Sequence, residues 1–247
     1  MKAIAYDLMA ELEESHWWYR ARRLIVSDLI LRLLPPPSDI IDYGAGAGGT
    51  ADSLKGRGYN VVAADISEEA LDACRVRGLA TVSLKYESLR SSSADCILVG
   101  DVLEHVNDDV ALLFSLRQTL RPRGLLVVTV PAYDFLWSGE DYVSEHVRRY
   151  TRRTLLQRLD LAGFRPVWCS YFNTLLFPAI ASIRITKRLL FPRQVYRSDV
   201  VRPPQWENET LFRLFASERR LLRWMRFPVG ASLLAVAQSV EANSCLN

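Results

Sequence analysis

The segment that most constrains the fold is a glycine-rich turn between a short apolar run and a helical pattern. Residues 39–43 (DIIDY) predict a buried strand, residues 44–49 (GAGAGG) the turn, and residues 50–55 a helix. A second buried strand over 60–64 ends at Asp65, whose carboxylate can accept hydrogen bonds from the two hydroxyls of a ribose. Glycines let the backbone turn tightly and approach a ligand, with amide hydrogens aimed at it. This unit predicts an α/β sheet that binds a nucleoside-containing cofactor.

The alternation of strands and helices continues through the first two thirds of the chain. Further strands are predicted near 79–84 and over 94–100, 125–130, 166–172 and 229–237, and helical patterns cover 3–34, 67–77, 108–120, 151–162, 174–191 and 206–225. Continuous apolar strands separated by helices indicate a parallel sheet with both faces covered. The two helical patterns over 174–225 stand between the last two strands and form an insertion.

Composition and cysteine spacing exclude several classes of protein. With 49% hydrophobic and 24% charged residues, the chain is neither disordered nor a disulfide-stapled miniprotein. Its four cysteines form no CxxC pair and have no histidine near them in sequence, so we expect no metal site and a reducing, cytoplasmic setting. No signal peptide is visible, and the longest uncharged apolar stretch, over 171–183, is too short to span a membrane.

Charge is divided unevenly along the chain. Residues 147–227 carry 17 Lys/Arg against 5 Asp/Glu, whereas the rest of the chain holds 14 against 23. This division favours either an anionic partner or surface for the basic segment, or a solvated basic face balanced by an acidic neighbour.

Several motifs together resemble the class I S-adenosylmethionine-dependent methyltransferases. Asp42 lies two residues before the first glycine, where a carboxylate would repel a pyrophosphate but suit an ammonium group. The strand over 94–100 leads into GDVLEHV (100–106), and an RPRGL turn follows at 121–125. The resemblance covers about residues 38–172 and the last strand. It implies a doubly wound, mostly parallel seven-stranded sheet in the order 3-2-1-4-5-7-6.

The resemblance also implies where the cofactor lies. Gly44, Gly46 and Gly48 would line its amino acid portion, Asp65 would hold the ribose, Ile66 would pack on the adenine, Glu87 and Ser88 would lie by the adenine amino group, and Asp101 would lie near the methionine end. The family more often has Asp at the Glu87–Ser88 pair. On this basis the chain divides into a helical cap (1–37), a cofactor-binding core (38–172), an insertion (173–228) and a final strand with its tail (229–247).

An aromatic and basic segment, HWWYRARR (16–23), precedes the sheet. A helix here would place Tyr19 and Arg23 on one face, four residues apart. An aromatic ring and a guanidinium so arranged could close over the carboxylate and the reacting methyl group of the cofactor. Alternatively, the segment is an amphipathic helix whose tryptophans cover the sheet edge.

His146 lies between the strand over 125–130 and the next helix, at the sheet edge where open α/β sheets bind ligands. A histidine there could accept a proton from the attacking hydroxyl or amine at neutral pH. Alternatively, His146 bonds Asp141 or a backbone carbonyl and only fixes the loop. His105 belongs to a recurring structural segment and is interpreted as structural.

These features predict an enzyme that transfers a methyl group from S-adenosylmethionine to an O, N or C nucleophile of a small-molecule acceptor, leaving S-adenosylhomocysteine. The insertion should emerge over the site. Its first helix would pack over the pocket or, alternatively, close a dimer or touch a membrane through 174–193 to reach a lipid-linked acceptor. A nucleic-acid methyltransferase would usually carry a Pro-Pro-aromatic motif after the fourth strand, where this chain has GDVLEH. The glycine turn by itself would also fit a nicotinamide-dependent oxidoreductase or a cofactor-binding protein without catalysis.

Overall fold

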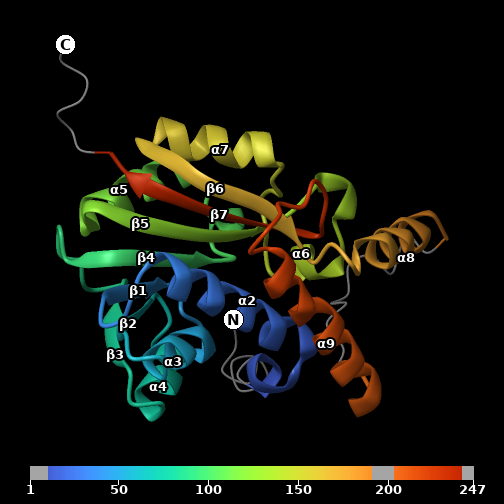
Figure 1. Ribbon diagram of the computed structural model, residues 1–247, viewed down its shortest axis with the longest axis horizontal. Coiled ribbons are helices and arrows are strands. Elements are labelled where there is room, and N and C mark those ends of the chain that lie inside the picture. The colour runs from blue at the N-terminus through green and yellow to red at the C-terminus, as the bar shows by residue number, and fades with distance from the viewer. Residues whose placement is uncertain (1–10, 191–202, 241–247) are drawn as a thin grey trace.

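The centre of the molecule is one seven-stranded sheet (Figure 1). The computed structural model describes residues 11–190 and 203–240. The strands are β1 (Asp39–Tyr43), β2 (Asn60–Asp65), β3 (Ala80–Ser83), β4 (Ala94–Gly100), β5 (Leu120–Pro131), β6 (Phe164–Phe172) and β7 (Ser232–Ser239). Their order is β3-β2-β1-β4-β5-β7-β6, and β7 runs antiparallel to both of its neighbours. The predicted fold class and strand order are confirmed.

Helices cover both faces of the sheet. They are α2 (Trp17–Leu33), α3 (Gly49–Lys55), α4 (Glu68–Val76), α5 (Asp109–Thr119), α6 (Gly139–Val143), α7 (Arg152–Leu161), α8 (Phe177–Leu190) and α9 (Gln205–Leu221), with short 3-10 turns η1 (Leu103–His105) and η2 (Asp134–Leu136). In Figure 1, α5 and α7 lie on one face, and α2, α3 and α4 lie on the other. Ser67 and Thr151 cap their helices by accepting hydrogen bonds from the amides of Ala70 and Thr154.

The core lies along the central strands. Ile97 and Leu98 of β4 and Val127 and Val128 of β5 are adjacent residues on each strand, and all four are buried. These strands therefore carry apolar residues on both faces, which is what a sheet covered by two helical layers requires.

Strands β5, β6 and β7 begin at positions that differ from the prediction, and β6 starts at Phe164 rather than 166. Strand β5 starts at Leu120 rather than 125, because Leu120 pairs with Ala94 ahead of a register shift. Strand β7 starts at Ser232 rather than 229, because the turn before it packs on the end of β6: a Cβ on Gly230 would collide with the backbone of Phe172.

The second half of the insertion packs on the N-terminal helix. Phe215 of α9 is buried against Trp17 of α2, with ring centroids 6.0 Å apart. The Asn208 carboxamide accepts a hydrogen bond from the Trp17 amide and donates one to the Ser15 carbonyl, both at 2.8 Å. Contacts between α2 and α9 therefore tie the cap to the insertion, although the two are far apart in sequence.

Helix α8 behaves differently from the prediction. It projects from the body at the right of Figure 1, and none of its residues is buried. Ile183, Leu189 and Leu190 are 56%, 74% and 66% exposed. Within the described residues its apolar side is therefore not packed over the pocket. The predicted contact segment 174–193 runs into residues 191–193, which lie outside the described residues, as do residues 1–10 of the cap and the tail from 241 with Cys245. No helix of the described ranges is long and apolar enough to cross a bilayer.

Candidate active site

A pocket lies between α2 and the carboxyl ends of β1, β4 and β5. Its lining includes Tyr19, Arg22 and Arg23 from α2, Asp42 and Gly44 from the end of β1, and Gly49 at the start of α3. Parallel strands present their ligand sites at this edge of the sheet. The structure therefore brings together four of the predicted site residues, Tyr19, Arg23, Asp42 and Gly44.

The glycine turn follows β1 in the conformation that its sequence allows. Gly44 has φ of +73°, and a Cβ there would collide with the side chain of Val102. Gly48 has φ of +81° and faces away from the pocket, since a Cβ on it would lie 2.7 Å from Sγ of Cys74 in α4. Gly48 is therefore needed for packing against α4, and Gly49 lines the pocket in its place.

Asp65 joins the glycine turn to the end of β2. Its buried carboxylate accepts hydrogen bonds from the amides of Gly46, at 3.0 Å, and Ser67, at 2.9 Å. A carboxylate has about four acceptor positions, so two remain for the hydroxyls of a ribose. Ile66 beside it is 70% exposed, which leaves its side chain available to an adenine.

Glu87 and Ser88 are exposed and lie outside the pocket lining. The Glu87 carboxylate accepts a hydrogen bond of 3.3 Å from the Ser83 amide at the end of β3. The pair therefore lies at the same sheet edge as Asp65, and its predicted contact with adenine stays a prediction.

Asp42 is a buried carboxylate that is divided between its protonated and ionised forms near neutral pH. Burial raises its pKa to about 7, helped by the negative charges of Glu13 and Asp65 and opposed by the positive charge of Arg22. A carboxylate in this state gains most from a cationic ligand, because a positive charge beside it favours its ionised form. Asp42 is thus suited to an ammonium group.

Glu13 was not predicted from the sequence, in which it is one of several acidic residues before α2. Its carboxylate accepts hydrogen bonds from the turn amides of Ala47 and Gly49, both at 3.3 Å. Its backbone carbonyl accepts a hydrogen bond of 3.3 Å from the Arg23 guanidinium. The turn amides thus bind a carboxylate in this structure, and Glu13 shows where an anionic ligand group fits.

Tyr19 and Asp101 both interact with Arg22. Burial raises the pKa of Tyr19 to about 12, so its hydroxyl stays neutral and can donate a hydrogen bond. Asp101, directly after β4, is in the left-handed region with φ of +57° and forms an ion pair with Arg22. Asp101, which the sequence predicts near the methionine end of the cofactor, is therefore paired with a residue of α2.

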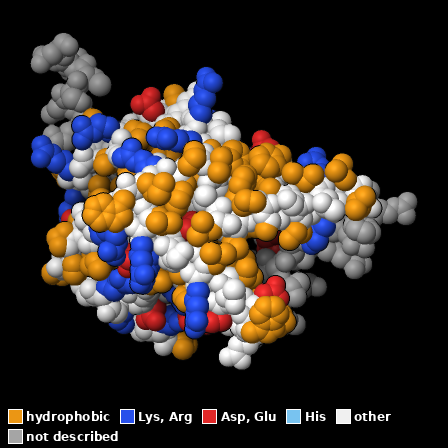
Figure 2. All heavy atoms as spheres, turned by 45° about the vertical axis from the view of Figure 1, so that its right-hand side comes forward, with side chains coloured by type: hydrophobic (Ala, Val, Ile, Leu, Met, Phe, Trp, Pro, Cys, Tyr) orange, Lys and Arg blue, Asp and Glu red, His pale blue; other side chains and the backbone are white. Residues whose placement is uncertain are grey.

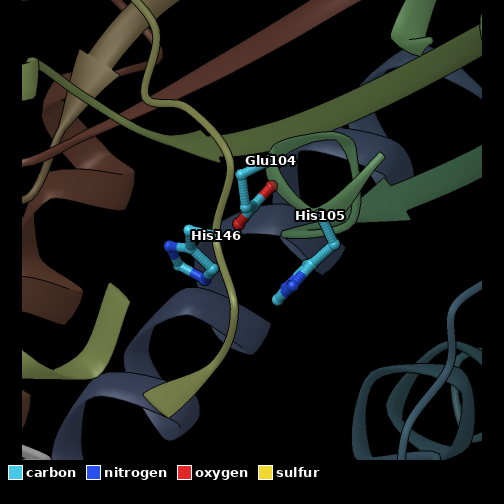
Figure 3. A group of neighbouring side chains, drawn as sticks. All are labelled: Glu104, His105 and His146. Carbon is cyan, nitrogen blue, oxygen red and sulfur yellow. The ribbon is translucent and has the colours of Figure 1, made fainter. Parts of the chain in front are cut away.

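His146 belongs to a second group, outside the pocket lining, with Glu104 and His105 (Figure 3). Its Nδ1 lies 2.9 Å from Oδ1 of Asp141, and its ring is 4.6 Å from that of His105. Hydrogen bonds from His146 and Arg149 hold the pKa of Asp141 well below its usual range, although burial alone would raise it. The alternative role of His146, a bond to Asp141, is therefore present in the structure.

Glu104 is the residue of this group that the sequence did not single out. Its side chain is fully buried, and burial raises its pKa to about 8, against the opposing charges of Arg22 and Arg149. Burial together with the neighbouring His146 lowers the pKa of His105, so His105 is held neutral near pH 7. In the sequence, the adjacent Glu104 and His105 after a strand were the available indication of this group. Their proximity to His146 depends on the fold.

The model of a methyltransferase domain family matches residues 17–168, more than half of the chain. The chain belongs to this methyltransferase family. That membership agrees with the resemblance found in the sequence and leaves no support for a nicotinamide-dependent oxidoreductase.

Curated relatives point the same way. A probable S-adenosylmethionine-dependent methyltransferase of Mycolicibacterium smegmatis is 25% identical over 160 residues, covering 62% of this chain and 61% of that protein. A ubiquinone biosynthesis O-methyltransferase of Xanthomonas oryzae is 28% identical over 141 residues, covering 51% of this chain and 59% of its own length. The methyltransferase chain thus matches about three fifths of the length of these relatives.

A solved structure shares the fold. The 1,6-didemethyltoxoflavin-N1-methyltransferase of Burkholderia thailandensis, with 1,6-didemethyltoxoflavin and S-adenosylhomocysteine bound, superposes with a TM-score of 0.56 at 16% identity. The match covers 97% of this chain and 88% of that one. At this identity the similarity establishes the fold of the family member and not its acceptor.

Proposed function

We propose that this protein transfers the methyl group of S-adenosylmethionine to a nucleophile of a small-molecule acceptor, with S-adenosylhomocysteine as the product. The observation that carries the proposal is the pairing, in one pocket, of the buried Asp42 with turn amides that bind the carboxylate of Glu13. A negative group and a set of anion-binding amides side by side complement an amino acid end that carries both an ammonium and a carboxylate.

The residues of the chain would bind and orient, while the cofactor supplies an activated methyl group on its sulfonium. Asp65 would hold the ribose hydroxyls and Ile66 would cover the adenine. Tyr19 and Arg23 of α2 would close the pocket over the methionine end. In-line displacement forms the bond from methyl carbon to acceptor and breaks the bond from methyl carbon to sulfur. Well-oriented reactions of this kind reach effective molarities on the order of 10⁵–10⁸ M.

The acceptor proton would leave toward the edge where His146 lies. The Asp141 carboxylate at Nδ1 orients the imidazole and leaves Nε2 as the atom that can take a proton or orient the acceptor. We expect His146→Gln to lower turnover far more than S-adenosylhomocysteine affinity. Equal losses in both, or none in either, would restrict His146 to fixing the loop.

An oxygen nucleophile is the first choice of acceptor, because the curated relatives include enzymes named as O-methyltransferases of ubiquinone biosynthesis. The test is release of S-adenosylhomocysteine from S-adenosylmethionine over a panel of phenols, carboxylic acids and amines. The matched control is Asp42→Ala, which should remove product from every active well. A panel without product, together with retention of tRNA or DNA on a filter, would favour a nucleic-acid acceptor instead.

A lipid-linked acceptor at a membrane surface is a second candidate, favoured by the exposed helix α8. Leu189 and Leu190 are exposed near its end, beside the cationic Lys187 and Arg188. Figure 2 shows hydrophobic side chains spread over the face toward which α8 projects. Apolar and cationic side chains on one helix suit an anionic bilayer surface. Flotation with anionic liposomes at low salt tests this, since a protein that stays at the bottom of the gradient does not use α8 as an anchor.

We also propose a cytoplasmic setting. Cys74, Cys96 and Cys169 are buried free thiols in the described part of the chain, which suits a reducing compartment.

A further inference from the structure

One buried carboxylate has no hydrogen-bond partner from any other residue in the described part of the chain. Among the buried carboxylates of the described chain, Glu104 alone has two oxygens that both lack a hydrogen-bond partner. The buried Asp109, by contrast, accepts a hydrogen bond of 2.8 Å from Tyr150 and pairs with Arg148. Burying an ionised carboxylate without a partner is costly, so a cation or a proton is needed beside Glu104.

Two imidazoles stand next to this carboxylate. One ligand atom each from Glu104, His105 and His146 lies within 4.8 Å of the others. The three side chains come from η1 and from the loop after α6, and they face a common space in Figure 3. Ligands at about 2.0–2.2 Å from one ion lie about 3–4 Å apart. Small side-chain rotations would therefore bring the three atoms to coordination distance.

Both rings are held in the manner of metal-bound histidines. The Asp141 carboxylate lies at Nδ1 of His146, so Nε2 is the atom left for a metal. The backbone carbonyl of Ser144 orients the His105 ring in the same way, because it accepts a hydrogen bond from a ring nitrogen. A carboxylate or carbonyl behind a ligating imidazole fixes its orientation and increases its basicity.

The neighbouring arginines do not prevent a cation from binding. Arg149 forms two hydrogen bonds with Asp141, at 2.7 and 2.8 Å, and Arg22 is paired with Asp101. Each arginine therefore has a carboxylate partner of its own, and neither donates a hydrogen bond to Glu104. His105 is the exposed member of the group, so an ion can enter from that side.

We propose that Glu104, His105 and His146 form a binding site for one divalent transition metal ion, with Zn²⁺, Mn²⁺ and Fe²⁺ as the fitting class. Two imidazoles and one carboxylate favour these ions over Mg²⁺ or Ca²⁺, which prefer sites made of oxygen ligands. Three protein ligands leave coordination positions open for water or an acceptor oxygen. The proposal replaces the sequence expectation of no metal, which rested on cysteine spacing.

The site goes beyond the proposed function and bears on one residue of it. Glu104 and His105 follow β4 and His146 follows β5, at the edge where the acceptor would bind. Nε2 of His146 cannot hold a metal and take a proton at once. With the ion bound, His146 is a metal ligand that orients the acceptor rather than the base.

The test is titration of chelator-treated full-length protein with Zn²⁺, Mn²⁺ and Mg²⁺ by calorimetry, without any S-adenosylmethionine. The wild type should bind one Zn²⁺ or Mn²⁺ per chain, and Glu104→Gln and His146→Gln should each weaken binding by at least about 10- to 100-fold. His16→Gln is the matched control, because His16 is the third histidine of the chain and lies at the start of α2. It should bind metal as the wild type does.

Thermal unfolding of the same proteins is the second measurement. Zn²⁺ should raise the melting temperature of the wild type and of His16→Gln and leave that of Glu104→Gln unchanged. Glu104→Gln itself should fold, because it replaces an unpartnered carboxyl group with an amide of the same shape. No binding by the wild type, or equal binding by Glu104→Gln, would overturn the proposal. Since methyl transfer is not measured, this failure is distinct from a failure of the proposed activity.

Discussion

Arg22 of α2 forms an ion pair with Asp101, the residue directly after β4. The pair joins the N-terminal helix to the edge of the sheet at the pocket. Burial raises the pKa of two acids, Asp42 in the pocket and Glu104 in the histidine group, and the positive charge of Arg22 opposes that rise in both. Arg22 therefore acts electrostatically on both halves of the site, although it precedes the whole sheet in sequence.

Replacing Arg22 should weaken both folding and cofactor binding. We expect Arg22→Gln to lower the free energy of unfolding by about 1–2 kcal/mol, because a half-buried carboxylate loses its partner. Affinity for S-adenosylhomocysteine should fall as well, because α2 is no longer held against β4. Chemical denaturation and calorimetry measure the two effects.

Arg20→Gln provides the control on the same helix. Arg20 pairs with Glu209 of α9 at 3.1 Å and is not part of the pocket lining. Its loss should leave S-adenosylhomocysteine affinity close to that of the wild type. If the two variants lose affinity equally, the ion pair with Asp101 has no special part in the site.

Glu13 should compete with the cofactor for the turn amides. Its carboxylate accepts hydrogen bonds from Ala47 and Gly49, and burial raises its pKa. We expect Glu13→Ala to bind S-adenosylhomocysteine more tightly by about 1 kcal/mol, or about fivefold, because the amides become available. Glu11→Ala, on the same segment, is the control and should not change affinity in a calorimetric titration. Weaker binding by Glu13→Ala would mean that Glu13 contacts the cofactor instead of competing with it.

The positions of most strands and the chemistry of the glycine turn were predictable because both depend on local patterns, whereas the order of the strands followed from the resemblance to the methyltransferase family. Residues 39–43 and the glycines after them specify a strand and a tight turn whatever surrounds them. The contacts of Glu13 with the turn and of Glu104 with His146 join segments 34 or more residues apart, and no spacing rule encodes them. Helix α8 was misjudged because an amphipathic pattern predicts that one side is covered, but not by which surface.

Asp65 should contribute to binding through the ribose. We expect Asp65→Ala to weaken S-adenosylhomocysteine binding by about 1–3 kcal/mol, since the ribose hydroxyls of the ligand lose their acceptor. The change also frees the amides of Gly46 and Ser67, so the melting temperature should be recorded and affinity measured well below it. Glu87→Ala should cost less, because Glu87 is exposed. Wild-type affinity in Asp65→Ala would show that the cofactor lies elsewhere.

Asp42 should destabilise the cofactor-free protein as the pH rises. Its pKa is about 7 in the folded chain against 3.8 for an ordinary aspartate, so the folded state favours the protonated form. The stability that this proton provides is complete below about pH 4 and is lost as the pH rises through 7.

Asp42→Asn cannot ionise, and its unfolding free energy relative to the wild type should increase by about 2–3 kcal/mol between pH 5 and pH 8. Asp39→Asn, on the same strand, is the control and should show no such change between pH 5 and pH 8, because hydrogen bonds from Arg121 and Asn60 lower the pKa of Asp39 and its titration lies below that range. Denaturation curves at the two pH values measure both variants. A pH-independent difference for Asp42→Asn would show that Asp42 is ionised throughout. Asp42→Asn should also bind S-adenosylhomocysteine more weakly, because an amide cannot neutralise the ammonium group of the ligand. The carboxylate that destabilises the cofactor-free protein at high pH is therefore the group that the ligand requires.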